Sequence, residues 1–166
     1  RGTDSRDQLK ILQSGEHIYV YNHGTTISGG KLPASSINAI DIATLGGNDL
    51  IEIQKIALSS IKVDVGTGYY NFVNIFQATV RDVNIIAIES RKTSVKFSAK
   101  ATNQVFVDYG ADADDNSFTS GYDSWIRTLK LRMSENQDTL NIAKNAYIET
   151  AEVSMGNGAD VLSLQP

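Results

Sequence analysis

The sequence has no cysteine, only two prolines in 166 residues, and no long apolar run. The absence of cysteine excludes disulfides, thiolate metal sites and cysteine nucleophiles. No apolar stretch approaches the roughly 18 residues of a membrane-spanning helix, so we expect no membrane span. Lysine and arginine are scattered along the chain and the net charge is −4, which argues against a nucleic-acid partner.

The residues that are present favour a folded β protein. Apolar residues make up 41% of the chain and charged residues 20%, which is typical of a globular domain with a sizeable core. Threonine, valine, isoleucine, tyrosine and phenylalanine are spread evenly along the chain, and these residue types favour strands.

A short pattern recurs six times, in which a turn residue is followed by alternating polar and apolar positions. A clear copy is Asp49-Leu50-Ile51-Glu52-Ile53, which follows two glycines. Successive copies are spaced by 22, 22, 23, 22 and 22 residues. The lead residues of the six copies are Asp49, Asn71, Thr93, Asn116, Asp138 and Asp160.

Two apolar columns follow from this repeat, because side chains two residues apart lie on the same face of a strand. We expect the first column to form one buried stack, and Ser120 to mark a gap or a polar bridge in the second. The first column is Ile51, Val73, Val95, Phe118, Leu140 and Leu162; the second is Ile53, Ile75, Phe97, Ser120, Ile142 and Leu164.

A repeat of 22 residues without a helical period predicts one coil of a solenoid. A second alternating segment, such as 61–65 or 129–133, precedes each turn, and a weaker third segment lies between them. We therefore predict an all-β, right-handed parallel β-solenoid of six to seven coils. A sandwich of antiparallel strands is the alternative, but it has no reason to keep this register.

The lead residues are expected to have a structural role. Asp, Asn and Thr side chains at the entrance to a strand can accept hydrogen bonds from turn N–H groups or bond along the stack. This role needs no ligand.

The two ends of the chain depart from the repeat. We expect residues 1–45 to form an irregular N-terminal hairpin or capping coil, with 12–36 covering that end, and 46–166 to form the regular coils. The chain stops partway through a coil, so 160–164 should be an exposed or partner-covered edge. The expected partners are further coils or a capping domain of a longer parent chain, a polysaccharide, or a second copy in end-to-end self-association.

Two glycine turns carry a resemblance to a known family. The segments 46–51 and 156–162 resemble the turns of the hemolysin-type (RTX) β-roll, and the coil resembles right-handed parallel β-helix proteins of bacterial secreted and surface polypeptides. The resemblance implies a non-enzymatic structural or adhesive module, located outside the cell or on its surface. The alternative is a carbohydrate-active β-helix, either a polysaccharide lyase, hydrolase or epimerase or its sugar-binding domain.

The densest group of acidic residues suggests calcium. Hard cations take six to eight oxygen ligands, and one turn supplies four carboxylates within eight residues. A solvated acidic turn is the alternative. The candidate ligands are Asp108, Asp112, Asp114 and Asp115.

The carbohydrate-active alternative has its own candidates. Two carboxylates on neighbouring coils could act as acid and base, beside an aromatic ring for sugar stacking. The short loops that would have to wall a groove favour the non-enzymatic interpretation. His17 and His23 are interpreted as surface residues of the hairpin, with a metal pair as the alternative. The candidates are Asp64, Asp82, Asp108, Lys62, Arg81, Lys130, Arg132 and Trp125.

Overall fold

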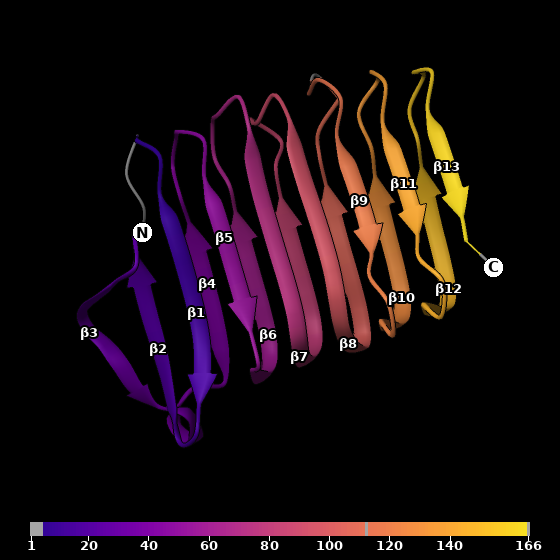
Figure 1. The fold of residues 1–166 in the computed structure, drawn as a ribbon. Helices are drawn as coiled ribbons and strands as arrows, with labels where there is room; N and C mark the ends of the chain where they lie inside the picture. Colours follow the sequence, from indigo (N-terminus) through magenta and orange to yellow (C-terminus); the bar gives the residue numbers. More distant parts are fainter. Residues whose placement is uncertain (1–4, 112, 166) are drawn as a thin grey trace.

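The computed structural model describes residues 5–111 and 113–165, and these form thirteen strands and one short 3-10 helix, η1, at Ala34–Ser36 (Figure 1). The strands are β1 (Gln8–Ser14), β2 (His17–Asn22), β3 (Thr25–Pro33), β4 (Ala39–Ala43), β5 (Leu50–Gln54), β6 (Ala57–Asp64), β7 (Asn71–Ile86), β8 (Thr93–Asp108), β9 (Ser117–Ser120), β10 (Trp125–Arg132), β11 (Thr139–Ile142), β12 (Tyr147–Ser154) and β13 (Val161–Leu164).

The chain winds as a solenoid of about six turns with two walls (Figure 1). The first wall contains β1, β5, β9, β11 and β13, together with the first halves of the long strands β7 and β8. The second wall contains β4, β6, β10 and β12, together with the second halves of β7 and β8. In Figure 1 the first wall lies in front and its strands run down, while the strands of the second wall, behind it, run up. The coils advance from left to right, so the winding is right-handed. The predicted all-β, right-handed parallel β-solenoid is confirmed.

Each coil pairs in parallel with the coils before and after it, in the register that the repeat predicts. Ile51 lies opposite Val73, Val73 opposite Val95, and Leu140 opposite Leu162. Because strand neighbours lie about 4.8 Å apart, a column of equivalent residues continues through the solenoid at that spacing.

The inner columns form the core. Ile51, Val73, Val95 and Phe118 are fully buried, and Leu140 is 4% exposed. In the second column, Ser120 is fully buried and its Oγ accepts the N–H of Ala143 on the next coil at 3.3 Å. The predicted polar bridge at Ser120 is therefore confirmed.

The chain turns from the first wall to the second at a bend of left-handed residues. Lys55, Gln77, Asp123 and Asn145 have φ angles of 56°, 52°, 56° and 62°. A left-handed conformation at a non-glycine residue is unusual and reverses the chain direction within very few residues. The bend therefore joins the end of each first-wall strand to the start of the second wall.

The turns that lead from the second wall back to the first depend on two glycines. Gly66 and Gly156 have φ angles of 61° and 84°. A side chain at Gly66 would collide with the Leu45 carbonyl, and one at Gly156 with the Ser134 carbonyl of the preceding coil. Glycine therefore lets the backbones of successive turns stack directly.

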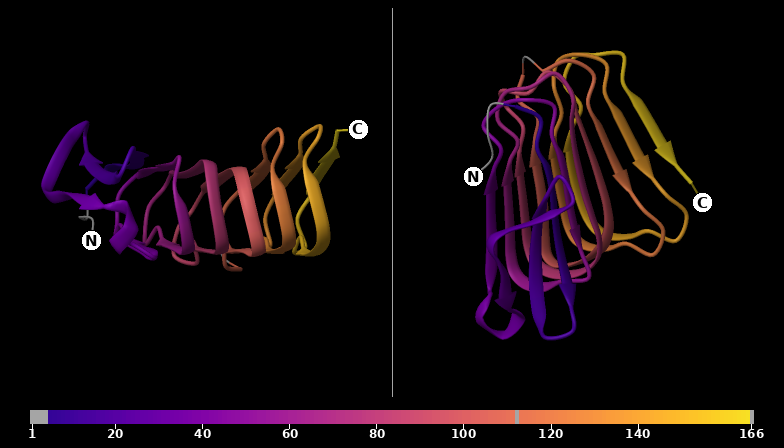
Figure 2. Two further views of the ribbon diagram at one scale, coloured as in Figure 1. Left: turned by 90° about the horizontal axis from the view of Figure 1, so that it is seen from below. Right: turned by 60° about the vertical axis from the view of Figure 1, so that its left-hand side comes forward.

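The N-terminal segment forms the expected hairpin and packs on the first coils (Figure 2). β1 belongs to the first wall, since it pairs in parallel with β5. β2 pairs antiparallel with β1, and β3 antiparallel with β2. Ile18 of β2 is 2% exposed, and Val20 and Ala34 pack against the same core. This segment therefore covers apolar side chains at the N-terminal end.

The C-terminal end is different, and one prediction for it is wrong. Leu162 was expected in the buried stack, but it is 60% exposed, and Leu164 is 65% exposed. Among the described strands, β13 pairs with β11 alone, so no further coil covers these side chains. An apolar hollow of about 500 Å³ opens here beside Leu140 and Val153. The expected exposed edge at 160–164 is present, while its pairing with further coils or with a second copy stays a prediction.

Leu140 and Leu162 provide a matched test of the core, because they occupy the same column with different burial. Leu140→Asp places an unpaired charge inside the solenoid and should cost several kcal/mol, a large part of the roughly 5–15 kcal/mol that stabilises a typical domain. Leu162→Asp should cost less than about 1 kcal/mol, because the side chain stays in water. Urea unfolding followed by circular dichroism measures both. Equal costs would contradict this assignment of the core.

Candidate functional site

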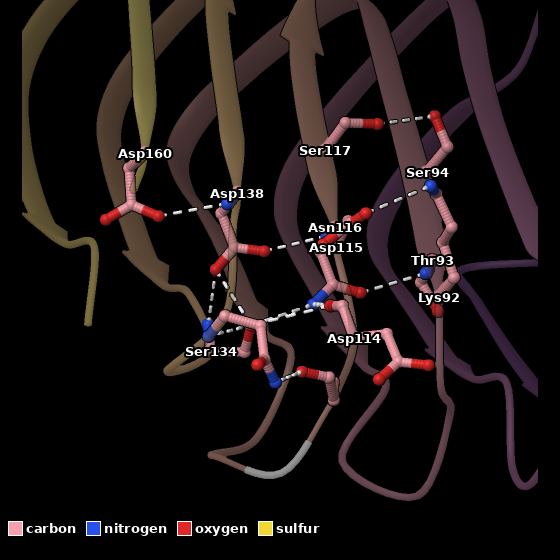
Figure 3. Close-up of polar contacts among 12 residues, drawn as sticks. Lys92, Thr93, Ser94, Asp114, Asp115, Asn116, Ser117, Ser134, Asp138 and Asp160 are labelled. Carbon is pink, nitrogen blue, oxygen red and sulfur yellow. Dashed lines mark hydrogen bonds and ion pairs between the residues drawn. The ribbon is translucent and has the colours of Figure 1, made fainter. Parts of the chain in front are cut away.

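The lead residues of the coils form a buried polar ladder at the turn into the first wall (Figure 3). At each ladder step, a side-chain Oδ1 atom accepts the backbone N–H of the equivalent residue on the preceding coil. The steps are Asp7 to Asp49 at 2.7 Å, Asp49 to Asn71 at 2.8 Å, Thr93 to Asn116 at 2.9 Å, Asn116 to Asp138 at 2.7 Å and Asp138 to Asp160 at 2.9 Å, with the N–H donor named first. The predicted bonding along the stack is confirmed.

The ladder changes where threonine replaces Asp or Asn. The N–H of Asn71 donates to the carbonyl of Lys92 at 2.9 Å and not to the side chain of Thr93. The hydroxyl of Ser90 lies 2.9 Å from Asn71 Nδ2 and 2.8 Å from Thr93 Oγ1, and it links the two side chains. All polar groups at this step are therefore paired, as buried backbone donors require.

A residue outside the repeat ends the ladder at the N-terminal side. Asn22, the last residue of β2, donates its Nδ2–H to Asp7 Oδ1 at 3.2 Å and accepts the N–H of Gln8 at 3.2 Å. Asn22 therefore supplies Asp7 Oδ1 with a hydrogen-bond donor, as the backbone N–H of the preceding coil does for the other Asp and Asn lead residues. Sequence reasoning missed this role, because Asn22 lies outside the 22-residue period.

Asp138 is the most completely bonded lead residue. Besides the ladder bond, its Oδ2 accepts hydrogen bonds from the N–H and the hydroxyl of Ser134, at 2.7 and 2.9 Å. Burial raises the pKa of Tyr109 well above its ordinary value, and the negative charge of Asp138 raises it further. The Tyr109 hydroxyl accordingly stays protonated and donates to the carbonyl of Ser117 at 2.7 Å.

The buried carboxyl group of Asp49 has fewer hydrogen bonds than that of Asp138. Burial raises the pKa of its carboxyl group above the ordinary value, although a hydrogen bond from the Asp7 N–H opposes the shift. The negative charge of Asp7 raises the pKa further. The ionised form of Asp49 is therefore disfavoured in the folded protein relative to the unfolded chain.

Asp49→Asn tests this imbalance, because asparagine keeps the ladder oxygen and already occupies the lead position at Asn71 and Asn116. We expect the variant to be more stable than wild type near pH 7, where wild type carries the buried charge. A raised folded-state pKa means that wild type gains stability as pH falls through that pKa toward the ordinary value of 3.8. The advantage of the variant should therefore shrink on acidification, as measured by thermal unfolding from pH 7 to pH 4. An advantage that grows on acidification would contradict the assignment.

The acidic turn proposed for calcium is partly engaged by basic side chains. Asp108 Oδ1 accepts the N–H of Gly110 at 3.0 Å, and its Oδ2 lies 3.5 Å from Arg132 Nη1. Asp115 Oδ2 lies 3.7 Å from Lys92 Nζ. Asp114 is exposed, and Asp112 lies outside the described residues. Within 5–111 and 113–165, no three acidic or histidine side chains converge as a metal site. Calcium at this turn stays a prediction.

Calorimetric titration tests calcium binding at the acidic turn. If the site exists, calcium should release or absorb heat and raise the unfolding temperature, with about 2.7 kcal/mol of stabilisation at a hundredfold excess over the dissociation constant. Asp112→Asn with Asp114→Asn should remove both effects. Asp123→Asn, an exposed acid on another turn, should leave them unchanged. No heat and no thermal shift at millimolar calcium would refute the site.

The acidic and basic candidates for carbohydrate chemistry lie on the second wall, where several are already bonded. Asp64 Oδ1 accepts the N–H of Gly66 at 3.0 Å, as Asp108 does with Gly110. Lys130 Nζ pairs with Glu152 at 3.1 Å, while Lys62 is exposed. The register brings Lys62 and Lys130 onto one outer column, and Asp64, Asp108 and Arg132 onto another.

Asp82 has the most strongly bonded carboxylate of these candidates. It accepts hydrogen bonds from Asn103 Nδ2 at 2.6 Å and from Arg81 Nε at 2.8 Å. Burial by itself raises the pKa of Asp82, but these two hydrogen bonds and the charge of Arg81 outweigh it and lower the pKa below the ordinary value. Asp82 is therefore held as an anion.

The two histidines lie at opposite ends of β2. His17 begins the strand and packs its ring against Tyr19, with ring centroids 6.2 Å apart. His23 follows the strand and donates from Nε2 to the carbonyl of Arg6 at 3.0 Å. Six residues of strand extend roughly 20 Å, so the two imidazoles do not share a site.

A groove that sequence reasoning missed lies on the outer surface of the first wall, beside the bend. This bend groove has a volume of about 860 Å³. Its lining residues are Asn74, Phe76, Gln77, Ala78, Lys96, Ser98, Ala99, Lys100, Thr119, Ser120, Gly121, Tyr122, Asp123, Asn141, Ala143 and Gln165. They come from five successive coils, so the groove runs along the solenoid axis.

An aromatic pair stands next to one residue of the bend groove. The rings of Trp125 and Tyr147 stack with centroids 6.1 Å apart and an interplanar angle of 13°. Lys100 Nζ, which lines the groove, lies 5.3 Å from the centroid of Trp125. Trp125 was a candidate for sugar stacking, but its partner was not identified. The sequence carries a signal for this pair, because Trp125 and Tyr147 are 22 residues apart and therefore occupy equivalent positions on neighbouring coils.

Comparisons with protein-family models, curated proteins and solved structures find no match to this chain. None of the helical structure in the described residues has the length and apolar character needed to cross a membrane.

Proposed function

We propose that this chain is a non-enzymatic structural and binding module of a secreted or cell-surface bacterial protein. The observation that carries the proposal is the bonding of the candidate carboxylates on the second wall. Asp64 and Asp108 hold glycine N–H groups of their own turns, and Asp82 holds Asn103 and Arg81. These groups stabilise the coils in which they lie.

Acid–base cleavage of a glycosidic bond has requirements that this arrangement does not supply. It needs one carboxyl group with a raised pKa as the acid and a second carboxylate on the other side of the bond. The pKa of Asp82 is lowered, which favours the anion and opposes a role as general acid. Among the residues lining the bend groove, Asp123 is the one carboxylate.

The construction of the solenoid suits a binding and structural role. The polar ladder and the apolar columns lie inside the coils, so they leave the outer surfaces of both walls free to vary. The bend groove offers amides, lysines and a tyrosine along five coils, and these groups can hydrogen-bond or pair with a ligand. The resemblance of the glycine turns to those of secreted bacterial proteins supports the proposed location.

The proposal predicts binding without turnover. We expect at least one member of a panel of neutral and acidic polysaccharides, cast into a native gel, to retard the protein. The protein should generate neither reducing ends nor unsaturated products from any member of the panel. The panel tests hydrolases and lyases together.

Turnover that depends on residues of the second wall would refute the non-enzymatic proposal. The informative variants are Asp82→Asn and Asp108→Asn, with Asp41→Asn on the same outer surface as the matched control. Cleavage that is abolished in either of the first two variants, retained in the control and accompanied by unchanged thermal unfolding would establish the carbohydrate-active alternative.

A further inference from the structure

The bend groove presents one polar side chain per coil along a straight line. Asn74 lies opposite Lys96, Lys96 opposite Thr119, and Thr119 opposite Asn141. Neighbouring strands are about 4.8 Å apart, so this column repeats at that interval along the solenoid axis. The interval is close to the length of one sugar unit in a linear polysaccharide, so a stretched chain can meet each coil with one unit.

The groove carries positive charge on an acidic protein. Two lysines and one aspartate line it, which gives a local charge of +1 against a net charge of −4 for the whole chain. The ion pairs formed within the described residues involve neither Lys96 nor Lys100. Both lysines are exposed, so their ammonium groups are available to an anionic ligand.

Aromatic rings border the same groove. Tyr122 lines it and is 65% exposed. The stacked rings of Trp125 and Tyr147 follow immediately beyond Lys100. The exposed ring of Tyr122 offers a flat apolar face together with a polar tip, which suits the C–H face and the hydroxyl groups of a pyranose.

The groove also contains amides with unused hydrogen-bonding capacity. The Oδ1 atoms of Asn74 and Asn141 are enclosed and have no hydrogen-bond partner in the part of the chain that the structure describes. Rotation of either side chain about its last bond exchanges the amide oxygen and nitrogen, so each amide can meet a ligand as acceptor or donor.

From these four observations we infer that the bend groove binds a linear acidic polysaccharide, with one sugar unit per coil. Lys96 and Lys100 face the sugar carboxylates, Asn74 and Asn141 bond hydroxyl groups, and Tyr122 stacks on a ring. The inference rests on the proposed role as a binding module and adds the ligand class and the site.

Calorimetry with a matched pair of oligosaccharides tests the ligand class. The probes are a hexamer of α-1,4-linked galacturonic acid and the same hexamer with its carboxylates reduced to alcohols. We expect the acidic hexamer to bind at least about tenfold more tightly, with an affinity that falls as salt rises. Equal affinities, or tighter binding of the reduced hexamer, would overturn the acidic assignment. Equally tight binding of a thymidine hexanucleotide would also overturn it, because the groove would then select charge alone.

Groove variants test the location of the site. Lys96→Gln with Lys100→Gln should weaken binding of the acidic hexamer about tenfold, and Tyr122→Ala should weaken both hexamers about fivefold. Lys62→Gln, an exposed lysine on the second wall, is the control and should bind as wild type. Thermal unfolding should be unchanged in all of them, because these side chains are exposed. Binding that survives the groove variants would overturn the site.

The outcomes separate this inference from the proposed function. Binding of the reduced hexamer that Tyr122→Ala weakens would preserve a sugar-binding module and reject the acidic ligand. Binding of the acidic hexamer that Lys62→Gln weakens, with no effect of the groove variants, would preserve the module and reject the groove. Cleavage of either hexamer would reject the non-enzymatic function itself.

Discussion

The hydrogen bond between a lead-residue side chain and the backbone N–H of the preceding coil is the interaction on which the other features of this solenoid depend. It occurs where the chain turns into the first wall, at a place that no strand ladder can serve. Without it, a buried N–H would stay unpaired at each ladder step, at a cost of about 1–3 kcal/mol. The bond also requires equivalent residues to lie directly above one another, and this aligns the apolar columns two and four residues further on.

The same requirement explains why the two ends differ. A ladder that passes from coil to coil needs a donor before its first member, and Asn22 supplies it from a hairpin strand that pairs with β1. The hairpin then buries Ile18 against the core. The last described coil has no equivalent arrangement, so Leu162 and Leu164 remain exposed although they continue the apolar columns. Position in the stack, and not residue type, decides their burial.

The bonds that stabilise this architecture and the lysines without an ion pair lie in separate places. Buried bonds between coils hold the fold, and several acidic residues on the outer surfaces add to it by bonding turn N–H groups or basic neighbours. Asp108, for example, accepts the N–H of Gly110 and lies 3.5 Å from Arg132 Nη1. The bend groove is distinct because Lys96 and Lys100 have no such ion pair among the described residues, which leaves their charge available for a ligand.

The sequence by itself determined the period, the solenoid, the lead-residue ladder and the polar bridge at Ser120, because each follows from residues that repeat every 22 positions. Even the stacking of Trp125 on Tyr147 was implicit in that spacing. Tertiary structure alone decided the role of Asn22, the exposure of Leu162, the partners of Asp82 and the bend groove. These depend on contacts between residues that no period relates, on which coil has a neighbour, and on how the left-handed bend shapes the outer surface of the first wall beside it.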